Sequence, residues 1–124
     1  MNIELVNVED IDVSTLKNCD LDYWVAREQG KEAYIHNGLC FLNASYRDWR
    51  DNPSGRYSPS TDWTLGGPII DSNDIELTGT RGYPKQAQVY HGRHDWSDAE
   101  GETNLIAAMR CYLKFKIATR NVKV

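Results

Sequence analysis

The chain has 124 residues, and its 14 Lys and Arg stand against 18 Asp and Glu, which gives a formal net charge of −4. Hydrophobic residues make up 40% and charged residues 26%, as in an ordinary globular domain with one core. Mean hydropathy is −0.62, and no apolar run has the roughly 18 residues of a membrane span. These values exclude membrane spans, collagen, disulfide-stapled mini-proteins and fully disordered tails, and they leave the function open.

The three cysteines, Cys19, Cys40 and Cys111, are widely spaced, and no CxxC pair is present to begin a zinc site or a redox dithiol. The first residues lack the basic and apolar regions of a secretory signal. We therefore expect a cytoplasmic protein with free thiols that pack as small hydrophobes.

Charge is distributed unevenly along the chain. Residues 1–30 hold seven acids against two bases, whereas residues 105–124 hold five bases and no acid. Either end could meet an oppositely charged partner. Acids near a helix start and bases near a helix end also suit the helix dipole, and this structural interpretation is favoured. The net negative charge argues against general nucleic-acid binding.

Residues 2–13 are rich in β-branched residues but alternate poorly, which predicts an edge strand or an extended arm. A helix follows over about 18–29, where Asn18 or Asp20 can cap the start and Gly30 suits the C′ position. Helical spacing places three apolar residues on its buried face, namely Leu21, Trp24 and Val25. The residues expected to face water are Asp22, Arg27 and Gln29.

Two short apolar runs, 33–36 and 39–42, flank Asn37-Gly38. Because this pair accepts positive φ at both central turn positions, it predicts a β-hairpin with a type I′ turn. The stretch 43–85 is rich in Gly and Pro but too long for one structureless loop. It is expected to hold a helical turn over 60–65 capped by Ser60 or Thr61, an extended piece over 68–70 and a short strand near 74–77. Alternation over 86–91 predicts a further strand.

The clearest element is a helix over about 103–119, which Thr103 or Asn104 can cap. Apolar residues recur there every three or four positions in a stripe wide enough for a core helix: Leu105, Ile106, Met109, Tyr112, Leu113 and Ile117. The predicted fold class is α+β, a single domain in which two main helices pack on a small, mainly antiparallel sheet.

Few residues suggest catalysis. His91, His94 and Asp95 are weak candidates for a metal site, or for a metal-dependent hydrolase, because the sequence nominates no further ligand. An exposed polar loop after a strand is the favoured interpretation. No nucleophile elbow, P-loop, GxGxxG, HExxH or EF-hand pattern is present, so no cofactor and no catalytic residue are nominated.

Residues 57–68 gather hydroxyls, a carboxylate and an aromatic ring in one window. The candidate ligand- or partner-binding residues are Tyr57, Ser58, Ser60, Thr61, Asp62, Trp63, Gly66 and Gly67. Mixed polar and aromatic walls are typical of ligand sites, and the amides of a Gly-Gly-Pro turn could cradle an anion. Alternatively, Asp62 caps a helical turn, Trp63 fills the core, and the glycines mark a tight bend.

A second candidate surface consists of Arg47, Trp49 and Arg50. Arginine and aromatic residues are frequent at interaction hot spots and on single-strand stacking platforms. Because Asp48 and Asp51 interleave with these residues and neutralise them, a protein contact or a solvated loop fits better than nucleic acid.

Three segments resemble, in the same order, motifs of the NinX-like phage proteins. Residues 21–30, LDYWVAREQG, are similar to the family's LDWAVAK…G helix, and residues 57–70, YSPSTDWTLGGPII, to its YSPSTDWxxGGPII signature. Residues 105–112, LIAAMRCY, are similar to its LIAAMRCYV helix. The resemblance spans about residues 13–118. It implies a small accessory protein of tailed phages and prophages, and it carries over no catalytic residue.

Two parts depart from the family pattern, an N-terminal extension over 1–12 and an insertion-like stretch over 43–55. Residues 13–124 are expected to form the single domain. A looser resemblance relates Val25-Ala26-Arg27…Gly30 and Pro59-Ser60-Thr61-Asp62 to phage counter-defence proteins that sequester signalling nucleotides.

We therefore expect a phage or prophage accessory protein that acts in the host cytoplasm by binding a host or phage protein, without catalysis. The alternative is a counter-defence sponge that binds a small anionic, nucleotide-like ligand through the Ser60–Pro68 loop. General nucleic-acid binding and membrane association are not expected, and a homo-oligomer is compatible with the sequence.

Overall fold

The computed structural model describes residues 11–92 and 95–120. Its helices are α1 (Asn18–Glu28), α2 (Trp63–Ser72) and α3 (Asn104–Arg120), with 3-10 turns η3 (Val13–Thr15) and η4 (Ala44–Tyr46). Strands β1 (Ala33–His36) and β2 (Leu39–Leu42) form one antiparallel sheet. Strands β3 (Glu76–Leu77), β4 (Lys85–Tyr90) and β5 (Trp96–Gly101) form a second antiparallel sheet in that order. The predicted α+β class is confirmed, with a third helix and a second sheet added.

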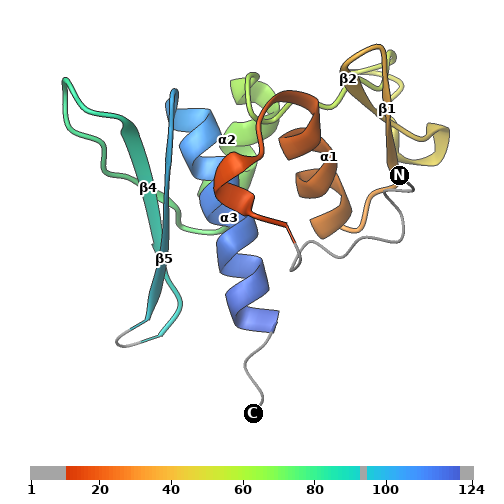
Figure 1. Cartoon of the computed structure of the whole chain (residues 1–124). Helices are drawn as coiled ribbons and strands as arrows, with labels where there is room; N and C mark the ends of the chain where they lie inside the picture. The colour runs from red at the N-terminus through yellow and green to blue at the C-terminus, as the bar shows by residue number, and fades with distance from the viewer. Residues whose placement is uncertain (1–10, 93–94, 121–124) are drawn as a thin grey trace.

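Helix α3 is the centre of the molecule. It lies between the β4–β5 sheet and α1, and the β1–β2 hairpin flanks α1 on its far side (Figure 1). Because α3 is covered on several sides, its buried residues surround much of its first three turns: Leu105, Ala107, Ala108, Met109, Cys111, Tyr112 and Leu113. This is the helix that the apolar stripe predicts. It is capped by Thr103, whose Oγ1 accepts a hydrogen bond from the amide of Ile106 at 3.1 Å.

Helix α1 confirms the helix predicted over about 18–29. Gly30 after it has the positive φ, 78°, of a C′ glycine. The predicted cap is wrong, because Lys17 is the N-cap residue and makes no side-chain cap bond. Asn18, the first helical residue, has φ 56°. The prediction that Asp22 faces water is also wrong. Its side chain is buried and accepts a hydrogen bond from the amide of Ser60, 38 positions along the chain.

The hairpin prediction is confirmed in detail. His36 pairs with Leu39, and the turn residues Asn37 and Gly38 have φ 51° and 75°. At the chain start, residues 2–10 of the predicted strand or arm lie outside the described residues. Val13–Thr15 form a 3-10 turn, which the Asp12 side chain caps.

Helix α2 corrects two predictions. The helix includes Pro68–Ile70, which is predicted as extended, and its N-cap is not Ser60 or Thr61 but Asp62, which confirms the alternative interpretation for this residue. The Asp62 carboxylate accepts from the amide of Thr64 at 2.9 Å. Packing on α3 and this cap hold the helix through its internal proline, although a helix with a proline there loses one backbone hydrogen bond.

Strand β5 is absent from the predictions, which read the region after His91 as a polar loop. Its sequence WSDAEG has no β-branched residue and no clear alternation. It forms a strand because it pairs along β4, from Tyr90 with Trp96 to Lys85 with Gly101, and because Ala99 is buried. The strands predicted near 74–77 and over 86–91 correspond to β3 and β4.

Across the described residues, no helix has the length and apolar composition needed to cross a membrane. The three cysteines are free thiols, as expected. Burial raises the pKa of Cys40 and Cys111 to about 12, so that both thiols stay protonated and chemically inert at neutral pH.

Candidate functional site

Residues 57–70, here called the signature segment, have an inner side that is built into the core. Its buried members are Tyr57, Pro59, Ser60, Gly66 and Ile69. The amide of Ser60 donates to Asp22 Oδ1 at 2.9 Å, and the hydroxyl of Tyr57 donates to Gln29 Oε1. Both bonds tie the segment to α1 and its C-terminal end.

Gly66 sets how closely α2 can approach α3. A Cβ atom at this position would lie 2.4 Å from the carbonyl oxygen of Pro59 and 2.6 Å from Leu105 Cδ2. Since real Cβ atoms do not approach backbone oxygen so closely, only glycine fits without movement of the chain. The first glycine of the pair therefore serves helix packing and does not mark a tight bend.

Asp22 lies at a cleft of about 230 Å³ between the start of α1, the β1–β2 turn and the signature segment. The cleft is lined by Asn18, Cys19, Asp22, Gly38, Leu39, Cys40, Arg56, Ser58 and Thr61. Burial raises the pKa of the Asp22 carboxyl to about 6, and the hydrogen bond from the Ser60 amide and the charge of Arg56 oppose that rise. The Ser60 hydroxyl is buried near this carboxyl and makes no hydrogen bond in the described part of the chain.

The amides of the Ser60–Pro68 loop are engaged within the chain. Ser60 donates to Asp22, the amides of residues 61 and 62 donate to the Ser58 carbonyl, and that of Thr64 donates to the Asp62 side chain. The amides of residues 65 and 66 donate to the carbonyl of Asp62. An anion that bound these amides would have to displace such bonds, and it would meet the Asp62 carboxylate.

The outer side of the signature segment is an open groove, here called the Trp63 groove, of about 400 Å³. It is lined by Trp63, Gly67, Ile70, Asp71, Asp74, Ile75 and Glu76. Trp63 is 53% exposed, so it does not fill the core as one of the two interpretations has it. Of the predicted site residues, Trp63 and Gly67 are thus brought together, while Ser58 and Thr61 line the Asp22 cleft.

The second predicted surface is organised by Arg47. Its guanidinium donates from Nε to the carbonyl of Leu42 and from Nη2 to the hydroxyl of Tyr34, both at 3.1 Å, and lies 5.4 Å from the ring centre of Trp49. Trp49 is 61% exposed, and Tyr34 stacks on Phe41 beside it. Arg50 is exposed, and its amide donates to Asp48 Oδ1. Arg47 therefore holds the 43–55 stretch against the hairpin and presents Trp49 to solvent.

Of the histidine cluster, the structure describes His91 and Asp95. His91 Nε2 lies 3.0 Å from Ser97 Oγ, and its ring packs against Phe115. His94 lies outside the described residues, and the Asp95 carbonyl accepts from the amide of His91 at 3.0 Å. Within 11–92 and 95–120, no group of His, Cys, Asp or Glu has the arrangement of a metal site.

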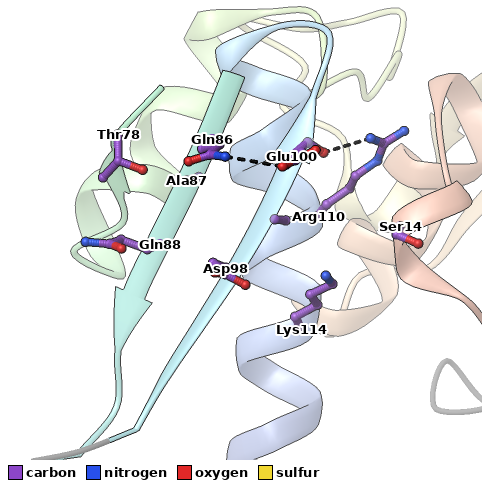
Figure 2. A pocket seen from close by; sticks show the side chains of 10 residues that line it. Ser14, Thr78, Gln86, Ala87, Gln88, Asp98, Glu100, Arg110 and Lys114 are labelled. Carbon is purple, nitrogen blue, oxygen red and sulfur yellow. Dashed lines mark hydrogen bonds between the residues drawn. The ribbon is translucent and has the colours of Figure 1, made fainter. Parts of the chain in front are cut away.

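The outward face of the β3–β5 sheet carries a polar pocket of about 420 Å³ that the sequence does not suggest (Figure 2). Gln86 donates to Glu100 across the strands, and Arg110 reaches from α3 to the carbonyls of Glu100 and Leu16, at 2.8 and 2.9 Å. Arg110 thus holds β5, which is an edge strand among the described residues, and the turn η3 against α3. Such an edge is otherwise open to pairing with another chain.

The sequence reasoning also misses Asp22 and Arg56, which face one cleft although they are far apart in the chain. The exposed acids Asp71, Asp74 and Glu76 were not predicted as site residues either, because the predicted helical turn ends at residue 65, and only the longer α2 brings this part of the chain beside Trp63. Local sequence patterns give no signal for side chains that only the tertiary fold brings together.

Comparisons with known proteins agree with the motifs. A model of the phage family described as "Bacteriophage P22, NinX" matches residues 12–116. A 2.0 Å crystal structure of a phage protein from Bacillus cereus ATCC 14579 is similar, with a TM-score of 0.55 and 18% sequence identity, over 84% of this chain and 96% of that one. At this identity the likeness concerns the fold. No curated protein matches the chain.

The family match includes all three motifs: the α1 segment, the signature segment and the start of α3. The resemblance predicted from the sequence is confirmed. This chain therefore belongs to the phage family described as Bacteriophage P22, NinX.

Proposed function

We propose that the protein is a non-enzymatic phage accessory protein that binds a segment of a host or phage protein in the Trp63 groove. The observation that carries the proposal is the position of Trp63. The buried residues of the signature segment are explained by packing and hydrogen bonds, but Trp63 remains 53% exposed over a groove.

An exposed tryptophan on a fixed element suits a binding hot spot. Tryptophan is enriched among hot-spot residues because its large ring buries much apolar area with few rotatable bonds. Helix α2 is held by the Asp62 cap at one end and by the contact of Gly66 with Pro59 and Leu105. Because the backbone that carries the ring is already ordered, binding at Trp63 costs little backbone conformational entropy.

Affinity purification from phage-infected host cells tests the proposal. Three baits would be compared: the unchanged full chain, Trp63→Ala and Trp49→Ala. The last variant removes a similarly exposed tryptophan from the surface that Arg47 organises. We expect the same partner protein with the unchanged chain and with Trp49→Ala, and its loss with Trp63→Ala. Equal recovery by all three baits contradicts the proposal. Thermal unfolding of each variant establishes that the fold is intact.

A second candidate function is the binding of a small anionic, nucleotide-like ligand. Two features of the Asp22 cleft favour it. Arg56 lines this cleft, and its exposed guanidinium makes no hydrogen bond or ion pair among the described residues. The start of α1 beside it has no side-chain cap. Helix starts and arginine both favour anions.

Thermal shift measurements with cyclic and linear nucleotides test this candidate. It predicts a saturable rise in Tm that Arg56→Gln removes, since the exposed position tolerates the change. A flat response across the panel contradicts it.

A further inference from the structure

We infer that the Trp63 groove receives a lysine or arginine side chain of a basic protein segment. The inference rests on the proposed function and names the chemistry of the partner. Three observations carry it: the charges that line the groove, the end of the helix that forms it, and the uncovered ring of Trp63.

The groove is acidic and contains no base. Asp71, Asp74 and Glu76 line it, and no Lys, Arg or His does. Glu76 accepts a hydrogen bond from Gln88 Nε2 at 3.2 Å, whereas the carboxylates of Asp71 and Asp74 have neither a hydrogen bond nor an ion pair within the described chain. A cation bound in the groove is attracted by all three carboxylates.

The helix dipole acts in the same direction. Asp71 is in the last turn of α2, and that turn has no basic residue. The C-terminal end of a helix carries partial negative charge and is usually accompanied by a base rather than an acid. Here the chain places a carboxylate at this end and Asp74 just after it. A cation from outside the chain would therefore meet favourable potential from both sources.

The ring of Trp63 provides the third contact. Other aromatic rings of this protein have a cation above them: Arg27 lies 5.2 Å from the centre of Trp24, and Lys31 lies 5.3 Å from that of Tyr57. Among the described residues, Trp63 has no such cation. The face of tryptophan attracts lysine and arginine more strongly than other rings do.

The apolar parts of the groove favour a protein segment over a free amine. Half-buried Ile70 lines it together with the edge of the core residue Ile75, and the missing side chain of Gly67 leaves open space on the helix surface. A peptide could lay its backbone along Gly67, bury an apolar neighbour against Ile70 and direct its cation to the carboxylates. Apolar contact supplies affinity, and the charges supply selectivity.

The test uses the full chain, labelled with ¹⁵N, and a short peptide that carries one arginine between apolar residues. The matched peptide replaces arginine with citrulline, which keeps the shape and loses the charge. The resonance of the Trp63 indole N–H reports binding. We expect a saturable shift with the arginine peptide, about tenfold weaker binding of the citrulline peptide, and weaker binding of the arginine peptide at high salt.

Two variants locate the effect. Asp71→Asn with Asp74→Asn removes two charges, and asparagine tolerates the φ of 53° at position 74. We expect this double variant to bind the arginine peptide several-fold more weakly. Glu102→Gln, at an exposed acid outside the groove, is the matched control and should leave binding unchanged.

Equal binding of the two peptides, or no shift with either, overturns the inference of a cationic partner. The proposed function is judged separately, since loss of the cellular partner on Trp63→Ala supports it whichever peptide binds. Retention of that partner by Trp63→Ala contradicts the proposed function.

Discussion

The two sides of the signature segment differ in what their residues do. On the inner side, the Ser60 amide donates a hydrogen bond to Asp22, and Gly66 packs against Leu105 of α3, so each residue has a structural partner. On the outer side, Trp63 and Gly67 line an open groove and have no comparable partner. The difference shows that a long, specific motif need not be a site throughout. Most of this one builds the fold, and the residues left over are the candidates for function.

The adjacent glycines of α2 test this division most severely. Gly66→Ala places a Cβ atom 2.4 Å from a backbone oxygen, and we expect it to lower the free energy of unfolding by about 3 kcal/mol. Urea unfolding followed by circular dichroism measures the change.

Gly67→Ala is the matched control, because no atom outside its chain neighbours and the adjacent backbone of α2 lies within 4 Å of its added Cβ. Alanine gains about 1 kcal/mol of helix propensity, and the clash of a Cβ with the following proline opposes that gain. The net change should stay within about 1 kcal/mol. Equal effects at the two positions would remove the distinction between the inner and outer sides.

Asp22 makes the inner side sensitive to pH. Its pKa is about 6 in the folded chain, against an ordinary value of 3.8, so the folded state holds the proton more tightly. This group's contribution to stability is complete below about pH 4 and is lost as pH rises through 6. The two pKa values differ by roughly 2, which corresponds to about 3 kcal/mol.

Asp22→Asn keeps an oxygen for the Ser60 amide and removes the titration. We expect the stability of the variant relative to the unchanged chain to rise between pH 4 and pH 7 by up to about 3 kcal/mol. Denaturant unfolding at several pH values measures it, and Asp20→Asn, an exposed neighbour, controls for general charge. A difference that does not change with pH would show that Asp22 is not desolvated.

Arg110, in the third family motif over residues 105–112, also has a structural role. Arg110→Met removes the charged donor from the carbonyls of Leu16 and Glu100, and we expect a loss of about 2 kcal/mol because both carbonyls then depend on water. Arg110→Lys, which keeps one donor group and the charge, should recover part of the loss. Unfolding in urea measures both; an unchanged midpoint for Arg110→Met would show that these bonds do not stabilise the β5 edge.

The sequence predicts the parts of this fold that depend on neighbouring residues. Asn37-Gly38 alone determines the hairpin turn, and the apolar spacing of α1 and α3 is visible without the partners they pack on. Strand β5 depends on its pairing with β4, and the helix through Pro68 depends on packing against α3. In both cases tertiary contacts override local preference.

The candidate site divides in the same way. Trp63 and Gly67 were predicted from one short window, whereas the buried Asp22 was expected to face water. The bond from Ser60 to Asp22 joins residues 38 positions apart, and no local pattern reports such a contact. Of the three carboxylates of the groove, Asp71 lies in the last turn of a helix whose predicted end is residue 65, while Asp74 and Glu76 follow the helix.

Trp63→Ala should have the smallest effect on stability. Its ring is 53% exposed, so we expect the free energy of unfolding to change by at most about 1 kcal/mol. Trp24, only 4% exposed in α1, is the matched control; its replacement by alanine should cost about 3–5 kcal/mol. Thermal and urea unfolding of the two variants measure this contrast between a core ring and a surface ring. A loss of several kcal/mol with Trp63→Ala would mean that the ring supports the fold. The division of the signature segment into a structural inner side and a binding outer side would then be wrong.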